Sequence, residues 1–274
     1  MTGKAVVPLV ARGDGTYTSN FLGRNCVLNG KKELDDHKQL VVDSGWYVYE
    51  TTMSELAELK TKKEKVDEIF KEKVIERIRD WVGIAEVNLK PKGGKIIVAP
   101  GNDDHLFIDP ILEGSDVIVN GEGKVLELDG HEMLSSGWSN PTPWDTPREC
   151  SEEDLAKKID GMASQIKDIQ KSFFSLHVPP FGSGLDNAPK LKENLQVATS
   201  GETAPVGSTA VLSAIQKYQP LLGLHGHIHE SMGTRKVGKT VCVNPGSNYT
   251  EGILNGAIVA LDEKGIKSVV FTSG

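Results

Sequence analysis

Short apolar runs that end at turn or polar residues constrain the fold of this chain most strongly. Residues 95–100, 172–176 and 221–224 each have the length and composition of a buried strand. Turn residues follow each run, which is typical of a strand that leads into a loop. Because amphipathic segments separate the runs, strands and helices are expected to alternate, and this alternation predicts an α/β fold.

Two segments between these runs have the pattern of amphipathic helices. Ser151 is a suitable N-cap for the first, with Asp154 three residues later as an imperfect capping box. The second helix is expected from about Ser208 to just before Pro220. The apolar stripe of the first helix consists of Leu155, Ile159, Met162, Ile166 and Ile169. The chain is expected to end in strands at 240–243, 257–261 and 268–271.

The residues before Gly94 have a different pattern. Residues 5–22 predict a β-hairpin, because two β-rich runs flank a turn at Asp14-Gly15. From about Glu64 to Ala85, apolar residues recur at helical spacing and predict one long amphipathic helix. We therefore expect a single domain over 1–274, in which 1–93 is a β-hairpin plus a helical insertion and 94–274 is the core.

Composition argues against several classes of function. A net charge of −7 disfavours general affinity for nucleic acids or anionic membranes, since both require clustered Lys and Arg. No apolar run approaches the ~20 residues of a membrane-spanning helix, and no signal-peptide pattern opens the chain. The three cysteines are odd in number and widely spaced, which favours reduced thiols in the cytoplasm. A small-molecule substrate is the expected partner.

Polar side chains follow three of the predicted strands. Asn102 follows the first run, His177 the second, and the pair His227 and His229 the third. Groups at the carboxyl ends of neighbouring strands in an α/β sheet converge on one crevice, so these side chains are expected to lie together. Imidazole is the commonest protein ligand for transition metals, so a metal site is predicted, with ordinary loop histidines as the alternative. His225 would project to the opposite face and is expected to be structural.

Several separated blocks of sequence resemble the calcineurin-like metallophosphoesterases, whose ordered motifs are D-x-H, G-D, G-N-[HD]-[DE], H and G-H-x-H. This chain contains the last three in that order, as Gly101-Asn102-Asp103-Asp104, His177 and Gly226-His227-Ile228-His229. Several blocks together are far more specific than any one of them. Accessory segments at 140–144, 146–149, 177–180 and 244–247 further resemble the prokaryotic phosphoesterases related to the cyclic-nucleotide phosphodiesterase group.

The resemblance implies two packed β-sheets flanked by helices and a site for two divalent metal ions, which would be Mn, Fe, Zn or Ni. It implies that Asn102, His177 and His227 bind one metal and that His229 binds the other. A metal-bound hydroxide would then hydrolyse a phosphomonoester or a phosphodiester. Asp103 stands where many relatives have a histidine that assists the leaving group, so it is the candidate catalytic residue. The alternative role for Asp103 is to orient a metal ligand through its carboxylate.

Two motifs of the family, D-x-H and G-D, are missing at their expected places. Asp14 could imitate the bridging aspartate of G-D, but a hairpin turn is favoured there. The D-x-H matches at 35–37 and 129–131 follow the wrong elements and are expected to be ordinary surface residues. Residues 1–4 resemble the segment that follows the bridging aspartate in relatives, so we hypothesise that the first βα unit is absent. One metal position would then keep three ligands and the other only one.

Two functions from different classes are compatible with these observations. The first is a metallophosphoesterase that acts on a small phosphate ester with two divalent metals. The second is a noncatalytic scaffold or binding protein that keeps the fold and an incomplete metal site, with one metal or none. A nucleotide-binding module is disfavoured, because neither G-x-G-x-x-G nor G-x-x-x-x-G-K-[ST] occurs.

Overall fold

The computed structural model of this chain describes residues 5–192, 196, 198, 201–263 and 265–274. These residues form two compact units. The C-terminal unit comprises Gly94–Asn248 and Ile253–Gly274, and the N-terminal unit comprises residues 5–93 with Tyr249–Gly252. The boundary falls at the turn of Gly93, whose positive φ of 64° ends a short 3-10 helix, η1 (Lys90–Lys92).

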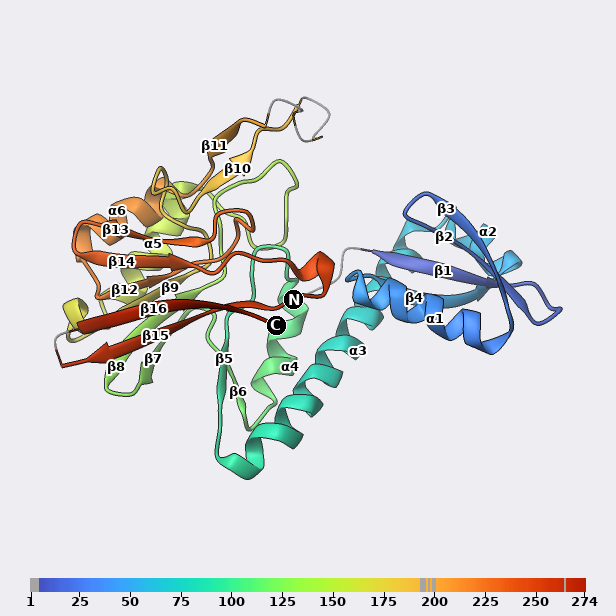
Figure 1. Cartoon of the computed structure of the whole chain (residues 1–274), viewed down its shortest axis with the longest axis horizontal. Helices are drawn as coiled ribbons and strands as arrows, with labels where there is room; N and C mark the ends of the chain where they lie inside the picture. The colour runs from blue at the N-terminus through green and yellow to red at the C-terminus, as the bar shows by residue number, and fades with distance from the viewer. Residues whose placement is uncertain (1–4, 193–195, 197, 199–200, 264) are drawn as a thin grey trace. The chain divides into compact units, whose positions relative to one another are not determined.

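A six-stranded sheet forms the centre of the C-terminal unit (Figure 1). Four neighbouring strands are parallel, and the two edge strands run antiparallel to their neighbours. In the order β13-β14-β12-β9-β8-β7, the strands are β13 (Gly233–Val237), β14 (Thr240–Asn244), β12 (Leu222–Leu224), β9 (Phe173–Leu176), β8 (His131–Ser136) and β7 (Lys124–Leu128). The parallel centre places the carboxyl ends of β8, β9, β12 and β14 at one edge.

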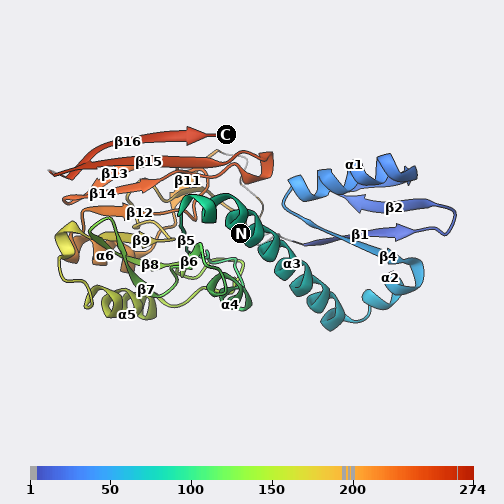
Figure 2. The ribbon, with the colours of Figure 1, turned by 90° about the horizontal axis from the view of Figure 1, so that it is seen from below.

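The two faces of this sheet are covered by different layers. Figure 2 shows the antiparallel hairpin of β15 (Asn255–Asp262) and β16 (Gly265–Ser273) on one face and α5 (Glu152–Ala163) on the other. Side chains alternate along β9, so Phe173 packs toward the hairpin whereas Phe174 packs toward α5 and α6 (Thr209–Tyr218). The predicted α/β fold, with packed β-sheets flanked by helices, is therefore confirmed.

A second, smaller parallel pair lies in the same unit. It consists of β5 (Ile96–Val98) and β6 (Ile118–Asn120), which are connected through η2 (Leu106–Ile108) and α4 (Asp109–Glu113). Two backbone hydrogen bonds continue beyond this pair, from Gly121 N to Val98 O at 2.8 Å and from Gly123 N to Ser135 O at 2.9 Å. They fix the end of β5 next to β8.

The predicted helix starts are confirmed at both major helices. The Ser151 hydroxyl accepts from the Asp154 amide at 3.1 Å, and the Ser208 hydroxyl accepts from the Val211 amide at 3.1 Å. The predicted extent of the first stripe is wrong, because α5 ends at Ala163. Ile166 and Ile169 lie beyond the helix, the latter in η3 (Ile169–Lys171), yet they pack against the same core. The chain then continues after β9 through a short antiparallel pair, β10 (Asn187–Pro189) and β11 (Thr203–Pro205).

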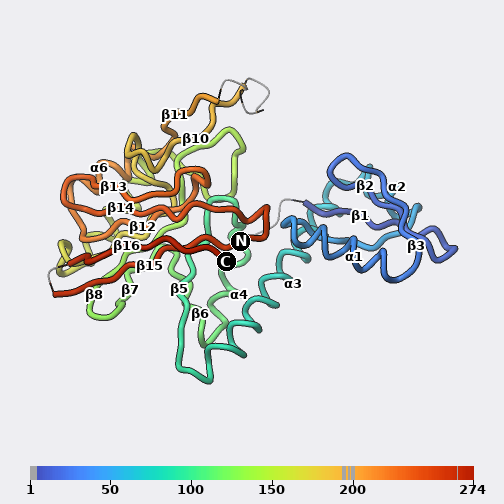
Figure 3. Tube along the Cα trace, viewed as in Figure 1, coloured from blue at the N-terminus to red at the C-terminus, as the bar shows by residue number. Residues whose placement is uncertain are grey.

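The N-terminal unit contains a four-stranded sheet in the order β3-β2-β1-β4. Its chain trace is drawn in blue in Figure 3. Its strands are β1 (Val6–Ala11), β2 (Thr16–Phe21), β3 (Arg24–Asn29) and β4 (Tyr47–Thr52). The predicted hairpin is β1 with β2, and the predicted long helix is α3 (Lys63–Leu89). The sequence pattern missed β3, β4, α1 (Gly30–Asp43) and α2 (Met53–Leu59). A 3-10 turn, η4 (Tyr249–Glu251), completes this unit.

Within the described ranges, no helix has both the length and the apolarity needed to cross a membrane.

Candidate metal centre

Three of the predicted ligands lie at the carboxyl ends of strands in the C-terminal unit. Asn102 follows β5, His177 directly follows β9, and His227 lies three residues beyond β12. Backbone pairing continues past the last two strands, because His177 N donates to Ser136 O and Gly226 N donates to His177 O, both at 2.9 Å. The sheet thus sets the positions of both histidines.

The rings of His177 and His227 both approach the side-chain oxygen of Asn102. Asn102 Oδ1 lies 3.0 Å from His177 Nε2 and 3.0 Å from His227 Nδ1. The two imidazole rings meet edge to face, with centroids 5.2 Å apart and an interplanar angle of 70°. Asn102 is buried and both histidines are half-buried. The predicted convergence of these residues is what the structure shows.

The His177 ring packs against the backbone of Gly101, where there is no room for a side chain. A Cβ on Gly101 would lie 2.8 Å from His177 Cε1, so any larger residue there would displace the imidazole. His227 has a positive φ of 59°, an uncommon conformation for a residue with a side chain. Asn244 Nδ2 donates to the carbonyl of the next residue, Ile228, at 2.8 Å and holds this strained turn in place.

Burial keeps both imidazoles neutral. Burial, with repulsion between the protonated forms of His177 and His227 as a smaller cause, lowers the pKa of His177 from 6.5 to about 3. Burial also lowers the pKa of His227, while the Asp103 carboxylate raises it and His229 lowers it. A neutral imidazole offers a lone pair to a metal ion.

Asp103 and His229, the other predicted site residues, are exposed side chains of the same loops. Both affect the pKa of His227: Asp103 raises it and His229 lowers it. The backbone carbonyl of His229 accepts from Ser247 N at 3.1 Å, in the turn after β14. The structure therefore places Asn102, His177 and His227 in direct contact, whereas Asp103 and His229 are exposed neighbours of these residues in the chain.

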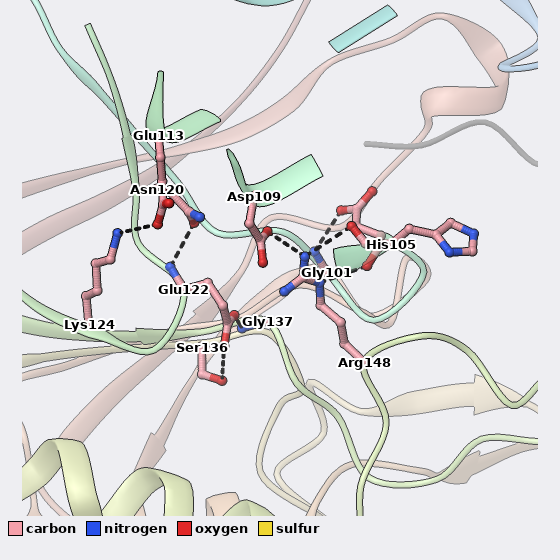
Figure 4. A network of polar contacts seen from close by, with 11 residues as sticks. Gly101, His105, Asp109, Glu113, Asn120, Glu122, Lys124, Ser136, Gly137 and Arg148 are labelled. Atoms are coloured by element: carbon pink, nitrogen blue, oxygen red, sulfur yellow. Dashed lines mark hydrogen bonds and ion pairs between the residues drawn. The ribbon is translucent and has the colours of Figure 1, made fainter. Parts of the chain in front are cut away.

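Asp104 has a structural role next to Asn102. It is 1% exposed, and its Oδ2 accepts from Gly101 N at 2.8 Å, which closes the turn that carries Asn102. Arg148, which is fully buried, donates through Nε to Asp104 O at 2.8 Å and pairs with Asp109 Oδ1 at 2.6 Å. Figure 4 shows the Arg148 guanidinium between Asp109 and the turn of Gly101.

The half-buried carboxylate of Glu122 supports the same region from the side of the sheet. Glu122 Oε2 accepts from Gly137 N at 2.5 Å, and Ser136 Oγ donates to Oε1 at 3.4 Å (Figure 4). Burial raises the pKa of Glu122. These bonds fix the segment after β8, the strand whose last carbonyl accepts from His177.

His225 is structural, as predicted. Its side chain is 6% exposed, and its Nδ1 lies 2.8 Å from Leu176 O, at the end of β9. Burial lowers its pKa to about 4. Cys26, Cys150 and Cys242 are free thiols in the structure, in agreement with the expectation of reduced cysteines.

The alternative acidic positions Asp14 and Asp129 lie in turns outside the three loops that contain the cluster. Asp14 lies in the β1–β2 turn of the N-terminal unit, where its carboxylate accepts from Thr16 N at 2.9 Å, so the favoured hairpin turn is confirmed. Asp129, with φ of 50°, lies in the turn between β7 and β8. The prediction for His37 was wrong, because it is 7% exposed and packs edge-on against Phe21 in the N-terminal unit. The hypothesis on residues 1–4 concerns positions outside the described residues.

The donor set of this cluster is suited to a divalent metal ion. Ligand atoms about 2.1 Å from one ion in neighbouring coordination positions lie ~3 Å apart, which is the separation of Asn102 Oδ1 from each imidazole nitrogen. An amide oxygen and two neutral imidazoles suit Mn, Fe, Zn or Ni. Among the residues that the structure describes, no group of three or more His, Cys, Asp or Glu side chains is arranged to hold a metal. The set is therefore one amide and two histidines without a carboxylate.

Sequence reasoning placed Thr146, Glu149 and Asn244 in accessory segments but did not identify how their side chains support the cluster. Asn244 holds the His227 turn, and Thr146 accepts from Asn102 Nδ2 at 2.9 Å. Glu149 in turn accepts from Thr146. The accessory segments that contain these residues resembled the family, but a resemblance does not say which atoms they contact. The sequence did offer one signal for the bond between Thr146 and Glu149, because a hydroxyl three residues before a carboxylate is close enough for a local hydrogen bond.

No protein-family model matches this chain. A curated relative, the uncharacterized protein MJ1162 of Methanocaldococcus jannaschii, is 28% identical over 153 residues. The match covers 55% of this chain and 63% of the relative, so it spans less than two thirds of the relative's length.

Two solved structures are similar to this chain. One crystal structure is 17% identical with a TM-score of 0.54, and the alignment covers 97% of each chain. At this identity the similarity shows a shared fold alone. The other, TT1561 of Thermus thermophilus, is 14% identical with a TM-score of 0.47, over 72% of this chain and 79% of that one. That TM-score is too low to establish a shared fold.

Proposed function

We propose that this protein is a metal-dependent phosphoesterase of the calcineurin-like family that hydrolyses a small phosphomonoester or phosphodiester. The observation that carries the proposal is the convergence of His177 Nε2 and His227 Nδ1 on Asn102 Oδ1, each at 3.0 Å. These residues belong to the motif blocks that resemble the family, and they come from three different strand ends. The shared fold with a solved structure is compatible with the proposal but does not identify the activity.

In this proposal Asn102, His177 and His227 hold one divalent metal, and His229 faces a second position. When bound, such metals polarise a phosphoryl oxygen and lower the pKa of a water molecule, which makes water a nucleophile at neutral pH. The protein supplies neutral imidazoles and a fixed amide oxygen. The Asp103 carboxyl, exposed beside Asn102, is proposed to protonate the leaving oxygen.

A second candidate function is a noncatalytic scaffold with an incomplete metal site. The specific observation in its favour is the absence of a carboxylate among the converging ligands in the described part of the chain. A bridged metal pair normally depends on a shared carboxylate, so binding without turnover is the expected behaviour of this alternative.

The two functions are separated by measuring metal binding and turnover on the same protein. Purified chain is stripped with EDTA and titrated with Mn²⁺, Fe²⁺, Zn²⁺ or Ni²⁺ by calorimetry, and it is then assayed against p-nitrophenyl phosphate and bis-p-nitrophenyl phosphate. A phosphoesterase binds metal and turns over at least one substrate, and His177→Ala reduces both. Metal binding with no turnover for any of the four metals favours the scaffold. If none of them binds the folded wild-type chain, the metal site itself is refuted.

The role of Asp103 is tested with substrates that differ in their leaving group. Asp103→Asn is expected to lower kcat ~10²-fold or more for an alkyl phosphate ester, whose leaving oxygen needs a proton, and much less for a p-nitrophenyl ester. Asp129→Asn, in the turn before β8, is the matched control and should leave both rates unchanged. Equal losses on both substrates would instead indicate that Asp103 orients a ligand.

A further inference from the structure

A chain of hydrogen bonds connects a carboxylate to the amide at the centre of the site. Glu149 Oε1 accepts from the Thr146 hydroxyl at 2.5 Å and from the Thr142 hydroxyl at 2.6 Å. Its two oxygens also accept from the backbone amides of Thr142 and Thr146, at 2.8 and 3.1 Å. Burial acts to raise the pKa of Glu149, but these four bonds outweigh it and hold the pKa below its usual range. The carboxylate is therefore ionised and can only accept.

The ionised carboxylate fixes the direction of the next bond. A hydroxyl has one proton, and that of Thr146 is committed to Glu149. The lone pairs of Thr146 Oγ1 therefore face Asn102, whose Nδ2 donates to them at 2.9 Å. An amide that presents its nitrogen on one side presents its oxygen on the other, and here the oxygen meets His177 and His227.

The backbone of the same loop is attached to the residue that it orients. Arg148 N donates to Asn102 O at 3.0 Å, and Ser139 N donates to Arg148 O at 3.0 Å. The Arg148 side chain, fully buried, is bonded to Asp104 O in the same turn as Asn102. Arg148 thus joins the segment of Thr146 to the segment of Asn102 through both its backbone and its side chain.

We propose that Glu149, acting through Thr146, is a positioning residue that selects the orientation of the Asn102 amide with its oxygen toward His177 and His227. With the opposite orientation an NH₂ group would face two imidazoles and no ligand oxygen would be offered to a metal. The effect of this orientation on metal affinity rests on the proposed function. The orientation of the Asn102 amide does not, because it is a property of the metal-free chain.

Three variants separate the contributions of the two residues. Thr146→Val keeps the shape of the side chain and removes the hydroxyl, and Thr146→Ser keeps the hydroxyl as the matched control. Glu149→Gln introduces an NH₂ group that donates to Thr146 and frees the hydroxyl proton to point at Asn102. Loss of such orienting partners typically costs 10–100-fold in metal affinity. We expect Mn²⁺ affinity by calorimetry to fall in this range for T146V and E149Q and to stay within a few-fold for T146S.

A second measurement on the metal-free protein reads the orientation directly. In the folded wild-type chain, NMR cross-relaxation should connect the Asn102 side-chain NH₂ to the Thr146 methyl group, and in E149Q to the imidazole protons of His177. An NH₂ group next to His177 in the wild type would overturn the proposal, as would unchanged Mn²⁺ affinity in folded T146V. If wild-type protein binds no Mn²⁺ but its NH₂ group lies at Thr146, the proposed function fails and the orienting role stands. Should E149Q not fold, T146V gives the same test.

Discussion

At the scale of single residues, the site depends on two glycines at positions where the surrounding atoms leave no room for a side chain. Gly101 admits the His177 ring, and Gly137 is more restrictive still, because a Cβ there would lie 1.4 Å from Pro100 O. That carbonyl belongs to the segment between β5 and Asn102. The backbone of Gly137 also donates to the half-buried carboxylate of Glu122. Close backbone packing next to the site thus depends on single glycines.

Gly137→Ala is therefore expected to destabilise the C-terminal unit strongly, by several kcal/mol if the backbone must move. Gly161→Ala is the matched control, because Gly161 lies in α5 with open space around its Cβ position. Alanine should stabilise that helix by about 0.5–1 kcal/mol. Urea unfolding monitored by circular dichroism measures both. Equal effects of the two substitutions would contradict the close contact at Gly137.

His37 gives the N-terminal unit a pH-dependent stability. Burial lowers its pKa in the folded chain, so folding favours the neutral ring. Its contribution is fully present above the unfolded pKa of about 6.5 and is lost as pH falls below that value. The unfolding equilibrium constant of the wild type should rise more steeply on acidification from pH 7 to 5 than that of His37→Leu, by less than tenfold per pH unit. Parallel pH profiles of the two proteins would show that His37 does not titrate on unfolding.

At the scale of elements, the two helices on one face of the large sheet are coupled through a single carboxylate. Glu152, in the first turn of α5, accepts at the start of α6 from Ser208 Oγ at 2.6 Å and from the amides of Thr209 and Ala210 at 3.0 and 2.9 Å. A carboxylate at a helix N-terminus satisfies amides that have no partner within the helix. The α5–α6 layer is thus joined by a cap contributed from a neighbouring helix.

Glu152→Ala should destabilise the C-terminal unit by about 1–2 kcal/mol, because three donors at the start of α6 lose their acceptor. Glu153→Ala removes the neighbouring glutamate, which forms an exposed ion pair with Lys157, and should cost little. Thermal unfolding of both variants is the measurement. A larger loss for E153A than for E152A would contradict the capping role.

Element-level prediction succeeded where the pattern was local. The strands before Asn102, His177 and His227, the cap at Ser151 and the helix start near Ser208 were all found from neighbouring residues. The sequence pattern did not predict β4. This strand pairs in parallel with β1, and β2, β3 and α1 lie between the two strands in the chain. The pattern also failed at the end of α5, because Ile166 and Ile169 pack against the helical core from outside the helix. Tertiary contacts decided both cases.

At the scale of the whole molecule, the described chain consists of two units of which one contains the candidate metal centre. The converging ligands all belong to the C-terminal unit. A ligand that binds only the folded state stabilises the part of the protein that holds its site. Metal binding should therefore act on the two units differently.

We expect Mn²⁺ to protect backbone amides of the C-terminal unit from hydrogen exchange, most strongly around Asn102, His177 and His227, and to leave residues 5–93 nearly unchanged. His177→Ala should abolish this protection, while exchange in the N-terminal unit stays the same. Mass spectrometry of peptides with and without Mn²⁺ provides the comparison. Uniform protection of both units would place the metal effect outside the proposed cluster.

The sequence by itself determined the α/β class and the order of the ligand-bearing strand ends, because periodicity, turns and caps depend on residues that are close in the chain. The strand-end positions also predicted that Asn102, His177 and His227 lie together, but only the tertiary structure decided which atoms meet, with Asn102 Oδ1 against ring nitrogens of residues 75 and 125 positions away. It also decided that Thr146 contacts that amide, that His37 is buried, and that Asp14 lies in a different unit from the cluster. The physical reason is that distant contacts depend on how strands pair and layers pack, which no local pattern specifies.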